Sequence, residues 1–336
     1  MAGRSTTLKK ILRLLGRSHG SMTQSEIQLR LKLSKSYLSE LLRSLENDGR
    51  IYRTRGDGRT KNVILRKSQG EAGYFNLGIL KSSEYIPLVA WLDNSANKMK
   101  LKLHFYNSTD RMFMDLDSGS LQACCAPLVS LITNFIIRRN FRIAFGLGYG
   151  GSYIFINDNA EKIGLLTSEN SSMSLLSARS FARDVFPKVA FSNPVEGVRK
   201  FIEGEAKYIS IWEPYASYLR NRGYRQVADY RTIMGEQTCC AFALSEKALD
   251  GSLPISGYSK IHPYPPESSE SFDRVISRFS RSLGIERTLI EESLHFYSFK
   301  RMEIDAKAVE ATGFNVTEDL LKAMISEKVR GKRIQK

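Results

Sequence analysis

The stretch IWEPYASYL, residues 211–219, combines side chains that could bind a small molecule. Trp212 offers an apolar aromatic face, and Glu213 offers a carboxylate that accepts hydrogen bonds from an amine. Pro214 suits the first position of a helix, so the stretch indicates a strand that turns directly into a helix. Open α/β sheets bind small molecules at such strand ends. The stretch therefore predicts a binding site for a flat, amine-bearing molecule.

A second group of residues with chemical meaning is the excess of Lys and Arg near the start of the chain. Residues 1–70 carry 16 Lys and Arg against 5 Asp and Glu, whereas residues 71–326 carry 29 of each. The last ten residues add 5 basic and 1 acidic side chain to the net charge of +15. Because the positive charge is confined to the two ends, it indicates a polyanion partner for the first 70 residues.

Apolar residues at helical spacing predict three short helices to carry these basic side chains: Leu8, Ile11, Leu12 and Leu15; Ile27 and Leu31; and Leu38, Leu41, Leu42 and Leu45. Thr23 and Glu26 have the spacing of a capping box at the start of the second helix. Gly49 suits a left-handed stop after the third. With the tight turn LKLS between the second and third helices, the pattern predicts a helix-turn-helix.

The basic stretch RIYRTRGDGRTKNVILRK, residues 50–67, predicts a strand, a Gly-rich turn and a second strand. A basic hairpin after the third helix resembles the wing of MarR-type and related prokaryotic winged-helix regulators. The resemblance implies double-stranded DNA as the partner, with contacts from Lys35, Ser36, Tyr37, Ser39, Arg43, Arg53, Arg55, Arg59 and Lys61. A winged helix that contacts protein is the alternative, and the arginine-rich hairpin favours DNA.

From Tyr74 onward, strand and helix patterns alternate with short joints, which is typical of parallel sheets covered by helices. Two such runs are followed by a return strand, TCCAFALSE, and a helical end. We therefore expect an α/β fold of two lobes between which the chain crosses twice. GLGYGG, residues 146–151, formally fits a dinucleotide fingerprint, but a strand follows it instead of a helix, so we interpret it as a crossing.

The order of these elements resembles the type II periplasmic binding proteins, specifically their nitrate, sulfonate and thiamine-precursor group. The matching phrases are SGSLQACCAP, NPVEGVRKFIEGEAKYISIWEPYASYLRNRGY and TCCAFALSEKAL, and the resemblance covers residues 74–300. Family members usually carry an acidic residue where this chain has Gln122 and Lys207. The resemblance implies a ligand in the cleft between the lobes, contacted by Ser82, Ser83, Cys125, Thr167, Ser168, Ser171, Ser172, Trp212 and Glu213.

Several of these residues have a structural alternative. The Ser and Thr cluster from Thr167 to Ser172 suits an anionic group beside helix amides, or it caps a helix. The adjacent pairs Cys124–Cys125 and Cys239–Cys240 are a poor layout for a disulfide framework and favour buried packing. The four histidines are scattered without ligand spacing. The sequence therefore predicts no metal site and no cofactor.

Together these patterns predict a cytoplasmic, ligand-responsive transcriptional regulator, without a membrane segment, that acts as a homodimer or higher homo-oligomer. Its parts are a winged helix-turn-helix (1–67), a linker (68–74), a two-lobed body (75–326) and a basic tail (327–336). The first lobe is expected at about 75–155 and 237–326, and the second at about 156–236. The expected effector is a thiamine-related metabolite, such as a phosphorylated aminopyrimidine, or a small anion. An enzyme that makes the thiamine pyrimidine, and a DNA-binding protein with a vestigial pocket, stay open as alternatives.

Overall fold

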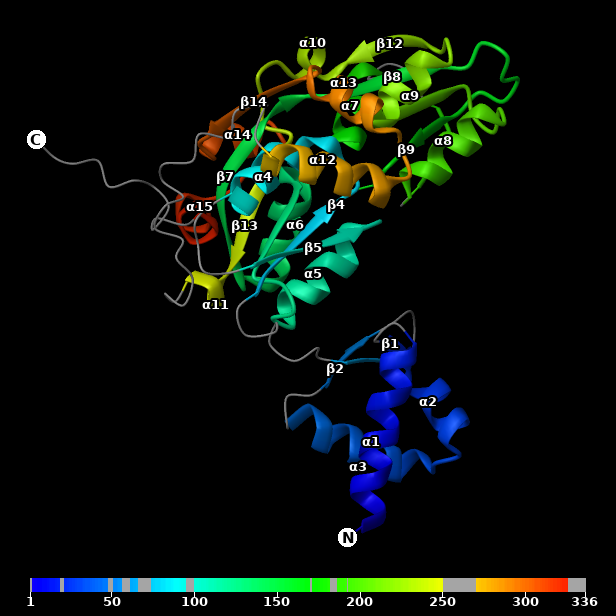
Figure 1. The fold of residues 1–336 in the computed structure, drawn as a ribbon, viewed down its shortest axis with the longest axis vertical. Helices are drawn as coiled ribbons and strands as arrows, with labels where there is room; N and C mark the ends of the chain where they lie inside the picture. The colour runs from blue at the N-terminus through cyan, green and yellow to red at the C-terminus, as the bar shows by residue number, and fades with distance from the viewer. Residues whose placement is uncertain are drawn as a thin grey trace, which may run out of the picture. The chain divides into compact units, whose positions relative to one another are not determined.

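The computed structural model describes residues 2–18, 21–47, 51–55, 61–65, 74–94, 100–169, 171–181, 186–191, 193–249 and 270–325 (Figure 1). The chain forms two compact units whose main boundary lies between Gly73 and Tyr74, and the short segment Ser118–Ser120 is grouped with the first unit. We call the unit before this boundary the head and the unit after it the body. In the described part of the chain, no helix is both long enough and apolar enough to cross a membrane.

The head consists of three helices and three short strands. In chain order they are α1 (Ala2–Arg17), β1 (Ser21–Thr23), α2 (Gln24–Leu31), α3 (Lys35–Asn47), β2 (Ile51–Arg55) and β3 (Lys61–Leu65). The apolar stripe of α3 is buried completely, and it packs with residues of α1 and α2 in one core. The capping box is confirmed, because Thr23 and Glu26 exchange hydrogen bonds at the start of α2.

The strands of the head pair antiparallel in the order β1-β3-β2. The sequence predicted the hairpin of β2 and β3 but not β1. Strand β1 has three residues, too few for a period of two to stand out, and its pairing of Met22 with Val63 spans 41 positions of the chain. Gly49 and the hairpin turn lie outside the described residues.

The first lobe of the body is built on a six-stranded sheet in the order β14-β7-β13-β6-β4-β5. Its strands are β4 (Tyr74–Leu80), β5 (Lys100–Tyr106), β6 (Ala123–Pro127), β7 (Phe141–Gly150), β13 (Cys240–Ser245) and β14 (Tyr297–Met302). Strands β4, β5 and β6 run parallel, whereas β13 and β14 pair antiparallel with their neighbours. Strand β14 was not predicted, since the sequence after Leu294 was taken as part of a helical end.

The second lobe has a five-stranded sheet in the order β10-β9-β11-β8-β12. Its strands are β8 (Ser152–Ile156), β9 (Leu165–Thr167), β10 (Lys188–Ala190), β11 (Tyr208–Trp212) and β12 (Arg225–Asp229). Strands β9, β10 and β11 are parallel, and β8 lies antiparallel between β11 and β12.

The expectation of parallel sheets is therefore wrong for β8, β13 and β14, which pair antiparallel with their neighbours. Strand β8 follows β7 after the single residue Gly151, so no crossover helix can reverse its direction before it joins the second sheet. The same connection places residues 152–155 in the sheet of the second lobe, whereas the sequence analysis assigned them to the first lobe. The interpretation of GLGYGG as a crossing followed by a strand is confirmed.

The helices of the body cover the faces of the two sheets (Figure 1). They are the 3₁₀ turn Ser83–Tyr85, α4 (Ile86–Asn94), α5 (Thr109–Asp117), α6 (Leu128–Arg138), α7 (Ser172–Ser180), α8 (Pro194–Ile202), α9 (Tyr215–Asn221), α10 (Tyr230–Met234), α11 (Glu246–Leu249), α12 (Glu270–Leu283), α13 (Arg287–Leu294), α14 (Ala306–Glu310) and α15 (Glu318–Met324). Two apolar cores lie on opposite faces of the first sheet, and a third fills the second lobe.

Candidate functional site

A cavity of about 350 Å³, which we call the cleft, is lined by residues of both lobes. From the first lobe, the end of β4, the start of α5 and the start of β13 contribute side chains. From the second lobe, the β9–α7 connection and the end of β11 contribute. The sequence predicted contributions after β4, β9 and β11, but not those of α5 and β13. The cavity has the volume of a site for a small metabolite.

Trp212 and Phe191 form an aromatic wall on the second-lobe side of the cleft. Their rings stack with centroids 6.0 Å apart and an interplanar angle of 29°, and both residues line the cavity. The indole nitrogen of Trp212 donates a hydrogen bond of 2.8 Å to the carbonyl of Lys81 in the first lobe. This bond holds the ring in place across the cleft, so the wall can receive a planar group.

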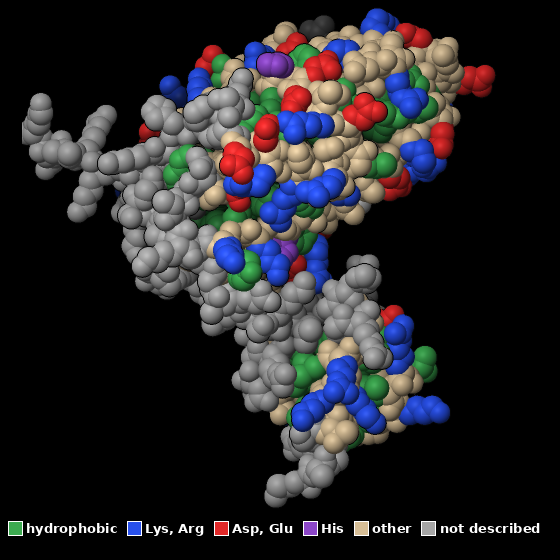
Figure 2. Space-filling model, viewed as in Figure 1, with side chains coloured by type: hydrophobic (Ala, Val, Ile, Leu, Met, Phe, Trp, Pro, Cys, Tyr) green, Lys and Arg blue, Asp and Glu red, His purple; other side chains and the backbone are tan. Residues whose placement is uncertain are grey.

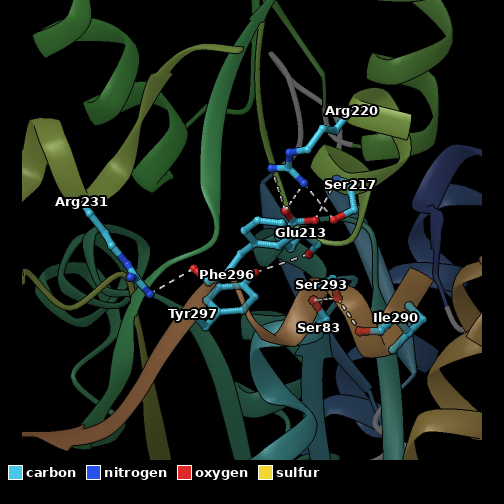
Figure 3. A network of polar contacts seen from close by, with 9 residues as sticks. All are labelled: Ser83, Glu213, Ser217, Arg220, Arg231, Ile290, Ser293, Phe296 and Tyr297. Atoms are coloured by element: carbon cyan, nitrogen blue, oxygen red, sulfur yellow. Dashed lines mark hydrogen bonds and ion pairs between the residues drawn. The ribbon is translucent and has the colours of Figure 1, made fainter. Parts of the chain in front are cut away.

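Glu213 does not face the cleft, contrary to the prediction. Its side chain is fully buried on the other side of the strand end, where it accepts a 2.8 Å hydrogen bond from the Ser217 amide. Arg220 lies 3.4 Å from the same carboxylate (Figure 3). Burial raises the pKa of Glu213 to about 7, and these two partners oppose the shift. Helix α9 begins at Tyr215, with Pro214 at its cap, so Glu213 satisfies the Ser217 amide in the first turn instead of a ligand.

Four of the predicted hydroxyl residues line the cleft, namely Ser82, Ser168, Ser171 and Ser172. The Ser171 hydroxyl accepts from the Met173 amide and donates to the Ser168 carbonyl. The Ser172 hydroxyl donates to the carbonyl of Cys239, 3.1 Å away in the first lobe. The Ser171 hydroxyl therefore caps α7, as the structural alternative predicted. The Ser172 hydroxyl joins the two lobes.

Ser83, Thr167 and Cys125 do not line the cleft, contrary to the prediction. Ser83 is fully buried and accepts a 2.9 Å hydrogen bond from Ser293 (Figure 3). Thr167 is buried beneath α7, where Ser177 donates to it. Cys125 lies inside β6 and packs into the core. Ser83 and Thr167 each lie next to a residue that does line the cleft, because successive side chains of an extended chain point in opposite directions.

Among the described residues, the charged side chains that line the cleft are those of three acids and one lysine: Glu84, Asp110, Glu169 and Lys81. Asp110 and Glu169 are exposed at its edge. Glu84 is 4% exposed, and one of its carboxylate oxygens is buried without a hydrogen-bond partner. Burial raises the pKa of Glu84 to about 7, against hydrogen bonds from the Cys240 thiol and amide. The lining is thus acidic overall, which disfavours an inorganic anion without a cationic partner.

Sequence reasoning missed Glu84, Phe191, Cys239 and Cys240 as lining residues of the cleft. Glu84 directly follows Ser82 and Ser83, which the sequence analysis did identify. Its position just after a strand could therefore have indicated that it lines the cleft. The two cysteines were interpreted as packing residues, since adjacent positions on a strand give no hint that both face one cavity.

The head presents the polar side of α3 to solvent. Lys35, Ser36 and Arg43 are exposed, and Tyr37 and Ser39 are half-buried. The Ser34 hydroxyl accepts a hydrogen bond from the Tyr37 amide, which fixes the start of α3. Lys and Arg side chains gather on the face of the head seen in Figure 2, with few acidic side chains among them.

Arg53, one of the predicted hairpin contacts, bonds within the head instead of standing free. Its Nε donates to Glu46 on α3 at 3.0 Å, and its side chain is 20% exposed. Arg55 and Lys61 lie on β2 and β3, but the structure does not describe their side chains. Arg59 lies outside the described residues.

One family model matches within the head. Residues 5–66 match a family described as a domain of unknown function, DUF7343. No curated protein matches the sequence.

The body is similar to several solved binding proteins. The ligand-binding component of an ABC-type import system from Staphylococcus aureus, solved with zinc bound, aligns with a TM-score of 0.61 at 14% identity over 77% of this chain and 98% of its own. The periplasmic aliphatic sulphonate binding protein of Escherichia coli gives 0.56 at 14% identity, over 72% and 90%. The periplasmic nitrate-binding protein of Synechocystis PCC 6803 gives 0.50 at 14% identity, over 70% and 74%. The body therefore has the two-lobed fold of periplasmic binding proteins.

Proposed function

We propose that this protein is a cytoplasmic transcriptional regulator whose head is a winged helix-turn-helix that binds double-stranded DNA. In this proposal the body binds a small metabolite in the cleft, and the bound metabolite changes the affinity of the head for DNA. The role of the cleft is binding and not catalysis. The observation that carries the proposal is the fusion of a basic head to a binding-protein fold with a lined cavity.

The arrangement of the head supports DNA binding. Its element order, α1-β1-α2-α3-β2-β3 with a three-stranded sheet, is the order of a winged helix. Helix α3 buries its leucines and exposes Lys35, Ser36 and Arg43, so its polar side is available to a major groove. Residues 1–70 also hold 16 of the 50 basic residues of the chain.

The cleft supports a planar, amine-bearing effector over nitrate or a sulfonate. The wall of Trp212 and Phe191 suits a flat ring, and the acids at the cleft accept hydrogen bonds from an amine. Because Glu213 is turned away, the carboxylates available are Glu84, Asp110 and Glu169. The hydroxyl of Ser171 is committed to capping α7, which weakens the case for a phosphate group on the effector. We therefore keep a thiamine-related aminopyrimidine as the effector and drop the requirement that it be phosphorylated.

The DNA-binding part is tested by comparing Arg43→Ala with Arg53→Ala in the full-length protein. Arg43 is exposed on α3, so its loss should weaken duplex binding and lower the slope of log K against log salt by about 0.9. Arg53 is bonded to Glu46, so its loss should change the slope less. Fluorescence anisotropy with a labelled duplex at several salt concentrations measures both. Equal slopes for wild type and Arg43→Ala would remove Arg43 from the interface.

The ligand part is tested by calorimetry of the full-length protein with 4-aminopyrimidine thiamine precursors, taurine and nitrate. We expect heat and one-to-one binding with an aminopyrimidine. Heat from nitrate or taurine alone would overturn the proposed effector class but leave the cleft as the binding site.

A further inference from the structure

Three side chains with metal-binding atoms meet at the wall of the cleft. One ligand atom from each of Glu84, Cys239 and Cys240 lies within 4.8 Å of the other two. The two sulfur atoms are 4.0 Å apart. Each residue is 4% exposed, and all three line the cavity. The group is therefore enclosed by protein but open to the cleft.

The convergence of the two sulfurs is unusual for adjacent residues of an extended chain, whose side chains point to opposite faces. The other pair follows the rule: in β6, Cys124 packs into one core of the first lobe and Cys125 into the core on the opposite face. Cys239 and Cys240 both contact the same core. Two identical dipeptides on neighbouring strands thus differ in whether their thiols can act together.

The backbone explains the difference. Cys240 is the first residue of β13, and Cys239 precedes the strand. The Cys239 amide donates to the Gly148 carbonyl, and its carbonyl accepts from the Leu128 amide at 2.9 Å and from the Ser172 hydroxyl. These bonds come from three separate elements and fix the backbone at Cys239 just before the strand begins, and the two sulfurs lie 4.0 Å apart in this arrangement.

Glu84 supplies the third possible metal ligand, a carboxylate oxygen. It also indicates independently that a ligand binds here. One of its carboxylate oxygens is buried without a hydrogen bond. Among the described residues, no Lys or Arg forms an ion pair with Glu84, although such buried acids are ordinarily paired. A buried carboxyl oxygen with no partner is costly unless a ligand satisfies it.

We propose that Glu84, Cys239 and Cys240 bind one thiophilic divalent cation of the zinc type. Tetrahedral zinc with Zn–S bonds of about 2.3 Å requires sulfurs about 3.8 Å apart, close to the separation observed here. Binding releases both thiol protons to solvent, leaving two thiolates and a carboxylate on the ion. Thiolate ligands select against magnesium and calcium, which prefer oxygen. Three protein ligands leave a fourth position that faces the cleft, where water or a ligand can bind.

This inference goes beyond the proposed function, since it requires neither DNA nor an organic effector. It is tested by adding Co²⁺ to the full-length protein after treatment with a chelator and a reductant. We expect one ion per chain, a sulfur-to-cobalt charge-transfer band and the intense visible bands of tetrahedral cobalt. Cys239→Ala and Cys240→Ala should each lose the charge-transfer intensity. Glu84→Gln should lower the affinity at least about tenfold, because even residues that only support a ligand cost that much.

Cys124→Ala and Cys125→Ala are the matched controls, and both should keep the band and the affinity of wild type. X-ray absorption of the zinc complex of the wild-type protein needs no variant, so it remains decisive if a substitution unfolds the body. We expect two sulfur neighbours at about 2.3 Å and the remainder nitrogen or oxygen. Absence of a charge-transfer band, an equal loss in the Cys124→Ala control, or wild-type affinity in Glu84→Gln would overturn the site. Because none of these readouts involves DNA or an aminopyrimidine, failure here leaves the proposed function standing.

Discussion

Trp212 and Glu213 are neighbours with opposite surroundings, and the contrast decides how the cleft can recognise a ligand. Trp212 lines the cavity and is held by Lys81, whereas Glu213 is fully buried against Ser217 and Arg220. The strand-to-helix joint was predictable from the order Trp-Glu-Pro. The direction of Glu213 was not, because it depends on an arginine seven positions later that no local pattern links to it.

Substitutions of Trp212 distinguish the contribution of its aromatic face from that of the hydrogen bond that holds the ring. A ligand at a hundredfold excess over its Kd should stabilise the wild-type body by about 2.7 kcal/mol. Trp212→Ala should lose this shift, whereas Trp212→Phe, which keeps a ring but not the bond to Lys81, should retain part of it. Thermal unfolding with and without an aminopyrimidine measures the effect, and Trp91→Phe serves as the control. A full shift in Trp212→Ala would place the ligand elsewhere.

Glu213 should make the stability of the body depend on pH. Burial raises its pKa to about 7 in the folded protein, above the value of about 4.3 for an unfolded chain. The folded state then binds more protons between these values, so stability is greatest below the lower pKa and falls as pH rises through 7. We expect Glu213→Gln to gain up to about 3 kcal/mol relative to wild type between pH 5 and pH 8.

The measurement is denaturant unfolding at several pH values, with the exposed Glu161→Gln as the control. Parallel profiles for wild type and Glu213→Gln would show that the Arg220 ion pair cancels the effect of burial.

At the scale of elements, the connection from β7 to β8 carries the chain between lobes through glycines that adopt left-handed backbone conformations. Gly151 has φ +65°, and a Cβ there would lie 2.1 Å from the Tyr297 ring. The glycine run and the strand after it were visible in the sequence. Strand β14, which pairs with β7, was missed, because the six residues from Tyr297 follow a helix and their partners lie about 150 positions earlier in the chain.

Gly151→Ala tests this connection against Gly223→Ala. Gly223 has φ +82° with nothing within 4 Å of its Cβ position, so it shares the backbone cost and lacks the clash. We expect Gly151→Ala to destabilise the body by about 1–3 kcal/mol more than Gly223→Ala, the usual cost of overpacking. Urea unfolding followed by tryptophan fluorescence measures both. Equal losses would mean that Tyr297 moves aside at little cost.

At the scale of the whole molecule, the sequence predicts a basic head (1–67), a linker and a neutral two-lobed body, and the described residues cluster into two units whose main boundary lies between Gly73 and Tyr74. Charge and periodicity are local properties, so the sequence alone can suggest such a division. Which side chains share one cavity is a product of the fold, as Glu84, Cys239 and Cys240 illustrate. Hydrogen bonds join the lobes next to the cleft, among them those from Trp212 to Lys81 and from Ser172 to Cys239. A ligand that strengthens or displaces them would shift the lobes, and coupling to DNA of about 1–3 kcal/mol is ordinary for such a change.

The most direct test of a regulator is whether the full-length protein selects particular sequences from a random library of DNA duplexes at physiological salt. We expect the retained duplexes to share a motif, with two half-sites if the protein acts as a homodimer. A substitution at Ser36 should change the preferred bases, since this exposed residue lies in the first turn of the helix proposed to enter the groove. A retained pool without any common motif, or no retained DNA at all, would contradict the account.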